Sequence, residues 1–337
     1  MRPFAGLITL ALLSMAASAV ADPVAAPGYE MEIVQEPGAI FAGLARDGDA
    51  LLVTNLANGR LYRRGADGEL TAFGPALPYG ADVMGDPTGP YRVARYGSAY
   101  IVAQGWTPAN NDEVNYDHAL LEIDETTIVR VVSNDFWNPY DFTLSGDTFF
   151  VIDAARNSVE RLSTDGDRAT VFTFARLTAS ESALQTLSPT EFGDKQSYEF
   201  DAVPTGIAAH DGRLYVSLFG GFPFIAGSGR IVSLPVAGPA SSARIETTDL
   251  NAPVDVVFDG KGDMLILEHG TFDPSGAWVS GSGRLLRINP ATGDRQIILD
   301  GLTRPVCVLI WDDRQLVVSE LGGNLYFLTR NPETKQE

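Results

Sequence analysis

The chain has 337 residues and a formal net charge of −19, which argues against nucleic acid or an anionic membrane as a partner. Its 34 glycines, 20 prolines and 45% apolar residues suit a fold of many short strands joined by turns. The single cysteine, Cys307, excludes an intrachain disulfide, and its place in the apolar run 306–310 predicts a buried, unreactive thiol.

The first 21 residues have the features of a secretory signal peptide. Arg2 supplies a positive start, residues 7–17 form an apolar core, and Ala-Val-Ala at 19–21 is a small-x-small cleavage site. That core is too short to span a bilayer, and no later stretch reaches about 18 uninterrupted apolar residues. We therefore expect cleavage near Ala21, a periplasmic or secreted mature protein, and no membrane insertion.

The rest of the chain aligns with itself six times at a period of about 50 residues. In five units a proline precedes the central apolar strand by about nine residues, and Phe41 holds that place in the first. Repeats of this length and composition indicate one four-stranded blade each. The prediction is an all-β, six-bladed β-propeller over residues 22–330, followed by a tail at 331–337. Its second strands centre on Val53, Val102, Val151, Val216, Ile266 and Val318.

Turn residues divide the repeats into strands. Asp-Gly and Asn-Gly pairs separate four predicted strands in the first repeat, at 42–46, 51–55, 60–64 and 69–73. The third repeat follows the same plan at 139–144, 148–153, 157–162 and 168–174. The last has only three, at 306–310, 315–319 and 324–328. We expect residues 29–35 to complete that blade, because sharing one blade between the two chain ends removes an exposed edge.

Long connecting segments occur at 105–117, 175–201, 219–228 and 269–282. In an up-and-down blade, the second-to-third connection and the blade-to-blade connection emerge on the same face. All four segments should therefore share one face, which predicts a binding surface there. The alternative is that they are decorative, since loops tolerate insertion.

These segments and their neighbours are rich in aromatic side chains, which prefer burial. They would line an apolar cup for a sugar, an aromatic metabolite or a peptide, with Asp112, Glu113, Asp117 and Asp273 at its rim. The alternative is that the aromatic rings only fix their own loops to the ring. The candidate ligand-binding residues are Trp106, Tyr116, Trp137, Phe222, Phe224, His269 and Trp278, together with Arg92 in the central channel.

One repeat position suggests charges inside the central channel. Arg92, Asp141 and Asp255 occupy equivalent places in blades 2, 3 and 5. If they face the channel, the two carboxylates could bind Ca²⁺ and Arg92 could steer an anionic substrate. The alternative is structural: each side chain caps its strand or pairs with a neighbouring blade. His269 follows Glu268, but neighbours on a strand point to opposite faces, so adjacency does not make them a dyad.

Three segments together resemble one protein family. They are 138–141 with 151–154, then 203–208 with 214–217 and 221–224, and finally 253–256 with 265–268 and 283–288. They are similar to the ScyD/ScyE family of exported six-bladed propellers, whose repeats resemble those of NHL and gluconolactonase-like propellers. The resemblance implies the fold and export, but no reaction.

The gluconolactonase-like relatives hold a divalent cation through carboxylate and amide groups directly after the strand-opening proline. Here that place holds Ala42, Tyr91, Tyr140, Thr205, Val254 and Val306, so the lactonase arrangement is not reproduced. We therefore predict a monomeric binding or accessory protein without chemistry of its own. It would use the loops of blades 2, 4 and 5 to bind a small molecule or a protein partner. The alternative is a lactonase-like, Ca²⁺-assisted hydrolase of lactones or esters at the channel mouth.

Overall fold

The computed structural model describes residues 22–332, apart from 83, 107–115, 181–196, 238–241 and 274. The predicted signal peptide, the middle of the blade 2 insertion and most of the tail lie outside this range. Among the described residues there is no helix long and apolar enough to cross a membrane.

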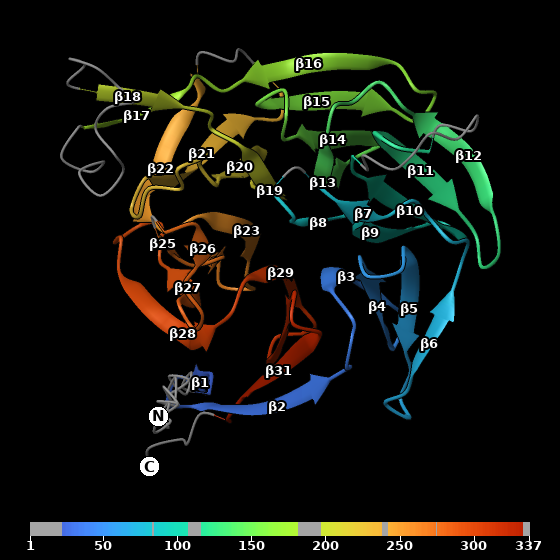
Figure 1. Cartoon of the computed structure of the whole chain (residues 1–337), viewed down its shortest axis with the longest axis horizontal. Coiled ribbons are helices and arrows are strands. Elements are labelled where there is room, and N and C mark those ends of the chain that lie inside the picture. The colour runs from blue at the N-terminus through green and yellow to red at the C-terminus, as the bar shows by residue number, and fades with distance from the viewer. Residues whose placement is uncertain are drawn as a thin grey trace, which may run out of the picture.

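Six antiparallel sheets surround a central axis, which confirms the predicted all-β, six-bladed propeller (Figure 1). Blade 1 consists of β3 (Phe41–Asp47), β4 (Ala50–Asn55), β5 (Arg60–Arg64) and β6 (Leu70–Phe73). Blade 2 consists of β9 (Pro90–Tyr96), β10 (Ala99–Gln104), β11 (Ala119–Ile123) and β12 (Ile128–Ser133). Blade 3 consists of β13 (Pro139–Ser145), β14 (Thr148–Asp153), β15 (Ser158–Ser163) and β16 (Arg168–Thr173).

The second half of the ring repeats this plan. Blade 4 consists of β19 (Pro204–His210), β20 (Arg213–Leu218), β21 (Gly229–Pro235) and β22 (Arg244–Leu250). Blade 5 consists of β23 (Pro253–Phe258), β24 (Met264–Glu268), β27 (Gly283–Ile288) and β28 (Arg295–Leu302). Blade 6 takes β29 (Pro305–Ile310), β30 (Gln315–Glu320) and β31 (Asn324–Arg330) from the end of the chain.

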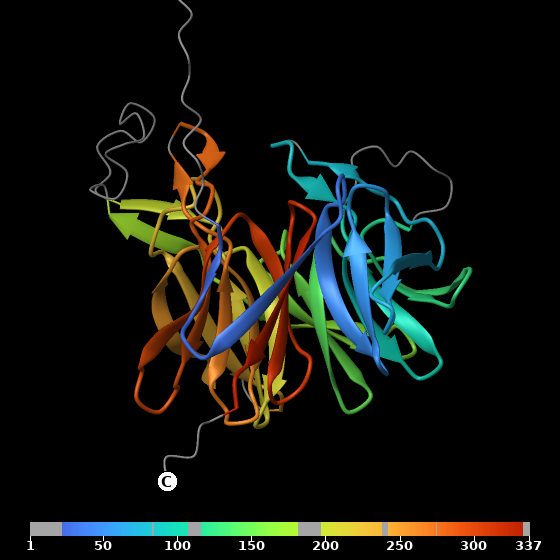
Figure 2. The ribbon, with the colours of Figure 1, turned by 90° about the horizontal axis from the view of Figure 1, so that it is seen from below.

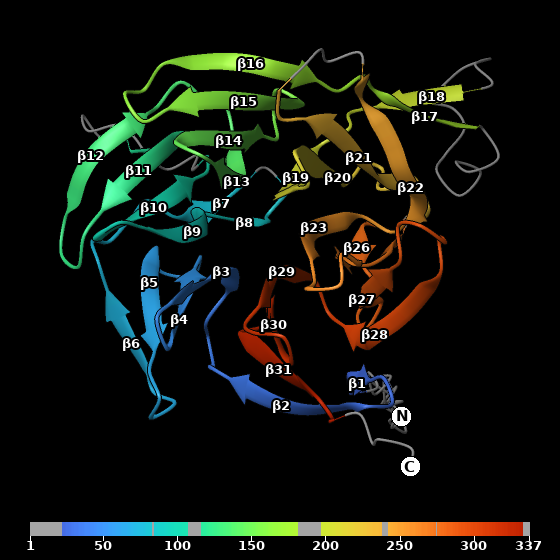
Figure 3. The same ribbon diagram turned by 180° about the vertical axis from the view of Figure 1, so that it is seen from behind.

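The N-terminal strand closes the ring as predicted. β2 (Tyr29–Gln35) pairs antiparallel with β31 as the outer strand of blade 6, from Tyr29 opposite Arg330 to Gln35 opposite Asn324 (Figure 3). The sequence did not predict β1 (Val24–Ala25), a short strand that pairs with β28 at the outer edge of blade 5. The start of the described chain therefore ties blades 5 and 6 together.

A register shift interrupts the inner pair of strands near the strand-opening residue in every blade. In blade 3, Pro139 lies opposite Asp153 and Asp141 lies opposite Ile152, so Tyr140 is the extra residue of a β-bulge. Proline is accepted because it is the first residue of its strand. A bulge redirects a side chain. The residues directly after the strand-opening residue, where the register shifts, are Ala42, Tyr91, Tyr140, Thr205, Val254 and Val306.

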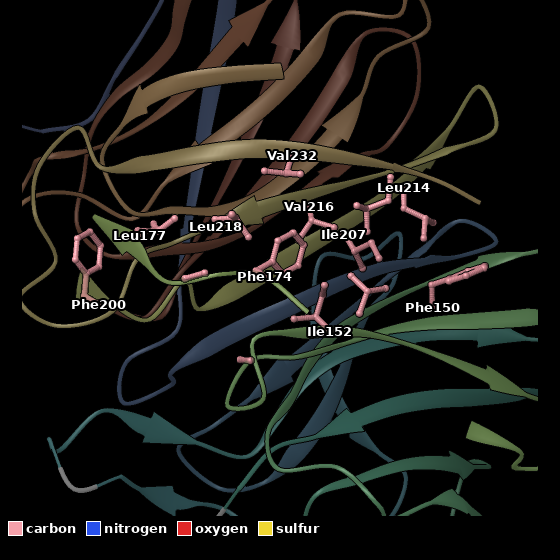
Figure 4. Close-up of a cluster of buried hydrophobic side chains, with 14 residues drawn as sticks. Phe150, Ile152, Phe174, Leu177, Phe200, Ile207, Leu214, Val216, Leu218 and Val232 are labelled. Carbon is pink, nitrogen blue, oxygen red and sulfur yellow. The ribbon is translucent and has the colours of Figure 1, made fainter. Parts of the chain in front are cut away.

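Apolar side chains fill the spaces between blades. One buried cluster joins β14 of blade 3 to β19 and β20 of blade 4 through Ile152, Ile207 and Val216 (Figure 4). The same cluster contains Leu177 and Phe200, which belong to the hairpin of β17 (Leu177–Ser180) and β18 (Ser197–Phe200). Each fully buried side chain of this kind contributes roughly 1.5–3 kcal/mol. This insertion is therefore packed onto the ring.

Three small hairpins project from one face of the ring, whereas the opposite face carries short turns (Figure 2). They are β17–β18 before blade 4, β25 (Phe272–Asp273) with β26 (Ala277–Trp278) in blade 5, and β7 (Gly80–Ala81) with β8 (Pro87–Thr88) before blade 2. The first two lie in segments predicted to share a face. The sequence did not predict β7–β8.

Candidate functional site

A cavity of about 510 Å³ opens on the hairpin face, at the mouth of the central channel. Its lining comes from blade connections, from the three hairpins and from the bulged residues of the inner strands. Four of the six bulged residues reach it: Tyr91, Tyr140, Thr205 and Val306. The repeated bulge therefore builds the cavity floor, because it turns the residue after the strand-opening proline toward the mouth.

Two stacked tyrosines form the centre of this floor. The rings of Tyr91 and Tyr140 lie 4.6 Å apart at an interplanar angle of 26°. Burial raises the pKa of both phenols, so both keep their protons. Neither hydroxyl has a hydrogen-bond partner among the residues that the structure describes, although Tyr91 is only 9% exposed. Neither hydroxyl oxygen is a fully buried atom without a partner. Both residues line the cavity, so the floor offers it two polar groups.

An aromatic wall stands on the side of blades 4 and 5. Phe219 and Phe224 come from the loop after β20, and Trp278 comes from β26. The Trp278 ring lies 5.0 Å from that of Phe224 and 5.6 Å from that of Phe219. Phe272 supports the wall from behind, 5.2 Å from Trp278. Phe222 is 53% exposed at the rim, so the wall continues to the opening of the cavity.

His269 is buried within the cavity lining beside this wall, and it is engaged at both ring nitrogens. Its Nδ1 lies 2.9 Å from the carbonyl oxygen of Pro305, which can only accept, so Nδ1 carries the proton. Its Nε2 accepts a hydrogen bond of 3.2 Å from Nε of Arg304. Burial, reinforced by the charge of Arg304, lowers the pKa of His269 to about 3. The imidazole is therefore neutral and positions Arg304.

Arg304 spans the cavity mouth. It lies in the connection between blades 5 and 6, and its Nη2 donates to Oδ1 of Asp86 at 2.6 Å. Asp86 belongs to the β7–β8 hairpin on the opposite side of the ring (Figure 1). A second ion pair, Arg176 Nε to Asp201 Oδ1 at 3.1 Å, lies on the β17–β18 side of the cavity. Charged groups therefore edge the aromatic wall.

An ion cluster lies in the channel below the floor. Nε of Arg92 is 3.1 Å from Oδ1 of Asp141, and Nη1 is 3.3 Å from Oδ2 of Asp255. Asp141 also accepts from the amide of Ile207 at 3.0 Å, and Asp255 from the amide of Val308 at 2.9 Å. These bonds link blades 2, 3 and 5 to one another and to blades 4 and 6.

Burial and neighbouring charges shift the pKa values of the groups in this cluster. Desolvation raises the pKa of Asp141 to about 7, although Arg92 acts in the opposite direction. Burial alone would lower the pKa of Arg92, but Asp141, Cys307 and Asp255 together raise it. The carboxylate oxygens of Asp141 and Asp255 accept from Arg92 and from backbone amides, and this arrangement favours the structural alternative. The metal role of Asp141 and Asp255 stays a prediction.

The structure brings four of the predicted ligand-binding residues together at the cavity: Phe222, Phe224, His269 and Trp278. The others lie elsewhere. The amide of Trp106 donates to Oδ1 of Asn138 at 3.2 Å, and Tyr116 packs against the core of blades 1 and 2. Trp137 is 59% exposed, with the guanidinium of Arg156 5.2 Å from its ring. Arg92 lies below the floor.

The predicted acidic rim also differs from the one observed. Asp112 and Glu113 fall outside the described residues, Asp117 is buried, and Asp273 does not line the cavity. Sequence reasoning missed the acidic residues that do line it. It also missed Arg304, which carried no local signal. Tyr91 and Tyr140 did carry one, because they directly follow the strand-opening prolines. The acidic lining consists of Asp82, Asp86, Glu199 and Asp201.

No protein-family model and no curated protein matches the chain. Several solved propeller structures are similar to it. A gluconolactonase from Xanthomonas campestris is similar over 89% of this chain and 89% of its own, with 12% identity and a TM-score of 0.57. The calcium-binding protein regucalcin from Agrobacterium tumefaciens covers 88% and 93%, with 12% identity and a TM-score of 0.54. Virginiamycin B lyase from Staphylococcus aureus covers 89% and 99%, with 12% identity and a TM-score of 0.51. At this identity the likeness shows the fold alone.

Proposed function

We propose that this protein binds a small molecule with an apolar or aromatic body in the cavity at the channel mouth. The observation that carries the proposal is an aromatic wall and a stacked tyrosine pair inside one cavity of about 510 Å³, where neither phenol hydroxyl has a hydrogen-bond partner within the described part of the chain. Ligand sites typically measure roughly 300–1,000 Å³ and combine apolar walls with a few polar groups. The cavity fits both features.

The state of His269 favours binding over catalysis. A general base needs a free lone pair within reach of the proton that it takes. His269 is the one histidine among the described lining residues, and its Nε2 lone pair already accepts from Arg304. The side chain therefore supports the cavity wall and the position of Arg304.

The binding proposal is tested with N-phenyl-1-naphthylamine, a neutral apolar dye whose fluorescence rises when water is excluded. We expect saturable binding. Trp278→Ala should weaken it by about five- to tenfold, because one stacked ring contributes roughly 0.5–1.5 kcal/mol beyond its buried area. Trp137→Ala is the matched control, since Trp137 lies outside the cavity. Equal losses in the two variants, or no saturable binding, would contradict the proposal.

Ca²⁺-assisted hydrolysis of lactones or esters is the second candidate, supported by the propeller fold that the chain shares with gluconolactonases. The donor set does not fit. The bulged sites at the floor hold Tyr91, Tyr140, Thr205 and Val306, whereas Ca²⁺ takes six or more oxygens, usually with several carboxylates. Among the described residues, no three His, Cys, Asp or Glu side chains are arranged to hold a metal ion.

Thermal unfolding separates the two candidates. Ca²⁺ at a hundred times its dissociation constant would stabilise the native state by about 2.7 kcal/mol. We expect EDTA, and Ca²⁺ added afterwards, to leave Tm unchanged. A fall in Tm with EDTA that Ca²⁺ reverses, and that Asp141→Ala and Asp255→Ala abolish, would instead support the hydrolase.

The proposal includes export and membership of the ScyD/ScyE family, both predicted from the sequence. The signal-like segment 1–21 and the segments 138–154 and 203–224 support them. Expression of the full chain in a Gram-negative host tests export. A mature product in the periplasm or medium that begins near Asp22 is expected, and an unprocessed cytoplasmic product would contradict it.

A further inference from the structure

The cavity carries more negative than positive charge. Arg304 pairs with Asp86 at 2.6 Å, and Arg176 pairs with Asp201 at 3.1 Å. Within the described part of the chain, no cationic side chain neutralises the other two carboxylates. The formal charge of the lining is therefore −2, and the net charge of −19 on the whole chain adds to it. The lining consists of four carboxylates, Asp82, Asp86, Glu199 and Asp201, against Arg176 and Arg304.

The negative charge reaches the cavity floor. Burial is the main reason why the pKa of the Tyr91 phenol is raised, and Asp82 and Asp86 add to the shift. For Tyr140, Asp255 and Asp141 below add to the effect of burial, whereas Arg304 acts in the opposite direction. A phenol that keeps its proton still has an oxygen that can accept a hydrogen bond. The floor thus presents two acceptors, and the charges of Asp82 and Asp86 favour a positive donor at Tyr91.

We propose that the ligand is an organic cation: an ammonium group on an aromatic or apolar body. This inference rests on the proposed function and specifies its ligand class. The ammonium lies over the tyrosine pair, within the field of Asp82 and Asp86, while the body packs against Phe224 and Trp278. Faces of aromatic rings attract cations, most strongly where water is excluded.

An anionic ligand meets an obstacle in the same cavity. Its natural partner is Arg304, but that guanidinium already donates to Asp86 and to His269. An anion that bound the remaining N–H groups of Arg304 would lie close to the negative charge of Asp86. The Arg304–Asp86 ion pair does not hinder a cation, because the carboxylates of Asp82 and Asp86 both attract it.

Three probes of similar size and different charge test the inference. They are 2-phenylethylammonium, 2-phenylethanol and 3-phenylpropionate, each titrated into the mature protein by calorimetry at low ionic strength. We expect the ammonium to bind about tenfold more tightly than the alcohol, and the carboxylate more weakly than both. Raising the salt concentration should narrow the difference, since salt screens exposed charges.

Asp82→Asn removes one of the two unneutralised charges but retains the side-chain oxygen that accepts from the amides of Met84 and Asp86. We expect it to weaken ammonium binding about three- to tenfold and to leave the alcohol unchanged. Asp273→Asn is a matched control: it lies in the β25–β26 hairpin of the same face, its Oδ1 accepts from the amide of Ser275 at 2.7 Å, and it does not line the cavity.

The outcomes separate this inference from the proposed function. Preference for the ammonium that falls in Asp82→Asn but not in Asp273→Asn would support both. Equal or tighter binding of the alcohol or the carboxylate would overturn the cationic ligand and leave a binding cavity. Absence of heat with all three probes would overturn the inference, while dye binding sensitive to Trp278→Ala would still uphold the proposed function.

Discussion

Arg92 illustrates how single residues hold this ring together. Its guanidinium contacts carboxylates from two other blades, and 18% of its side chain is exposed. Each carboxylate in turn accepts from a backbone amide of the next blade, at Ile207 or Val308. Buried charges are tolerated only when they are paired and hydrogen-bonded. Arg92 therefore compensates two carboxylates that the channel could not otherwise contain.

Replacing Arg92 should destabilise the fold strongly. We expect Arg92→Met to lower the free energy of unfolding by roughly 3–5 kcal/mol, because it leaves two buried carboxylates without their cation. Urea denaturation measures the change. In the control Arg130→Met, an exposed pair with Glu122 is lost, and the expected cost is below about 1 kcal/mol. Similar losses for the two variants would show that the cluster has no special structural role.

His269 should make stability depend on pH. Its pKa is about 3 in the folded protein, below the ordinary value of 6.5, so the unfolded chain binds more protons between these values. The contribution of the neutral His269 to the free energy of unfolding is complete above pH 6.5. It is lost as the pH falls toward 3, and the loss reaches about 3 kcal/mol at pH 4.

The variant His269→Gln isolates this contribution. Asp141 acts in the opposite sense, since its raised pKa of about 7 favours the folded state as the pH falls. The difference between wild type and His269→Gln removes that background. Urea titrations at pH 7 and pH 4 should show a smaller loss of stability in the variant. An identical loss in both proteins would mean that His269 is not kept neutral by the fold.

At the level of elements, the β-bulge recurs at the same place in each blade. It follows the opening residue of the inner strand, and in blades 2, 3, 4 and 6 it presents one side chain to the cavity. The hairpins add walls around that floor, and apolar contacts such as those of Leu177 and Phe200 fix one of them to the ring. The cavity is therefore built from repeated strand geometry together with non-repeated insertions.

The closing strand β2 offers a test at this scale. A chain that begins at Glu36 lacks β2 and exposes the seven-residue edge of β31, whose unpaired amides and carbonyls favour aggregation. We expect this chain to be insoluble or to melt well below the mature protein. A chain that begins at Pro27 loses only β1 and should remain folded. A soluble Glu36 chain with an unchanged Tm would contradict this role of β2.

At the level of the whole molecule, both chain ends contribute strands to blade 6, so the ring closes on itself (Figure 3). Closure pairs the edge of β31 with β2, and the net charge of −19 opposes association. We propose that the protein is a monomer. Light scattering at low and moderate salt should give the mass of one chain. A dimer mass at both salt concentrations would contradict this.

The strands were predictable because their signal is local. Blade 3 was predicted at 139–144, 148–153, 157–162 and 168–174, and its observed strands differ by one residue at most at each end. Alternating apolar residues and Gly-containing turns specify a strand with little reference to the rest of the chain. The Asp-Gly and Asn-Gly turns, together with the period of about 50 residues, were sufficient to predict six blades.

The site was predictable only in part. The sequence predicted four of the cavity residues because they lie in long insertions: Phe222, Phe224, His269 and Trp278. In the sequence, Tyr91 and Tyr140 were identified only as positions that lack a metal ligand. Their stacking was not predictable, because it depends on how two neighbouring blades pack. Trp106 and Trp137 share the aromatic composition of the wall, yet blades 2 and 3 direct them elsewhere.

The sequence by itself determined the number of blades, the strand plan and the face that bears the insertions, because these follow from periodicity and turn chemistry along the chain. Only the tertiary structure decided which charges meet. Arg304 and Asp86 are 218 positions apart, and Arg92 and Asp255 are 163 apart. Ring closure brings these groups together, and an ion pair leaves no pattern in the residues around either partner. The charge of the cavity is therefore a property of the closed ring.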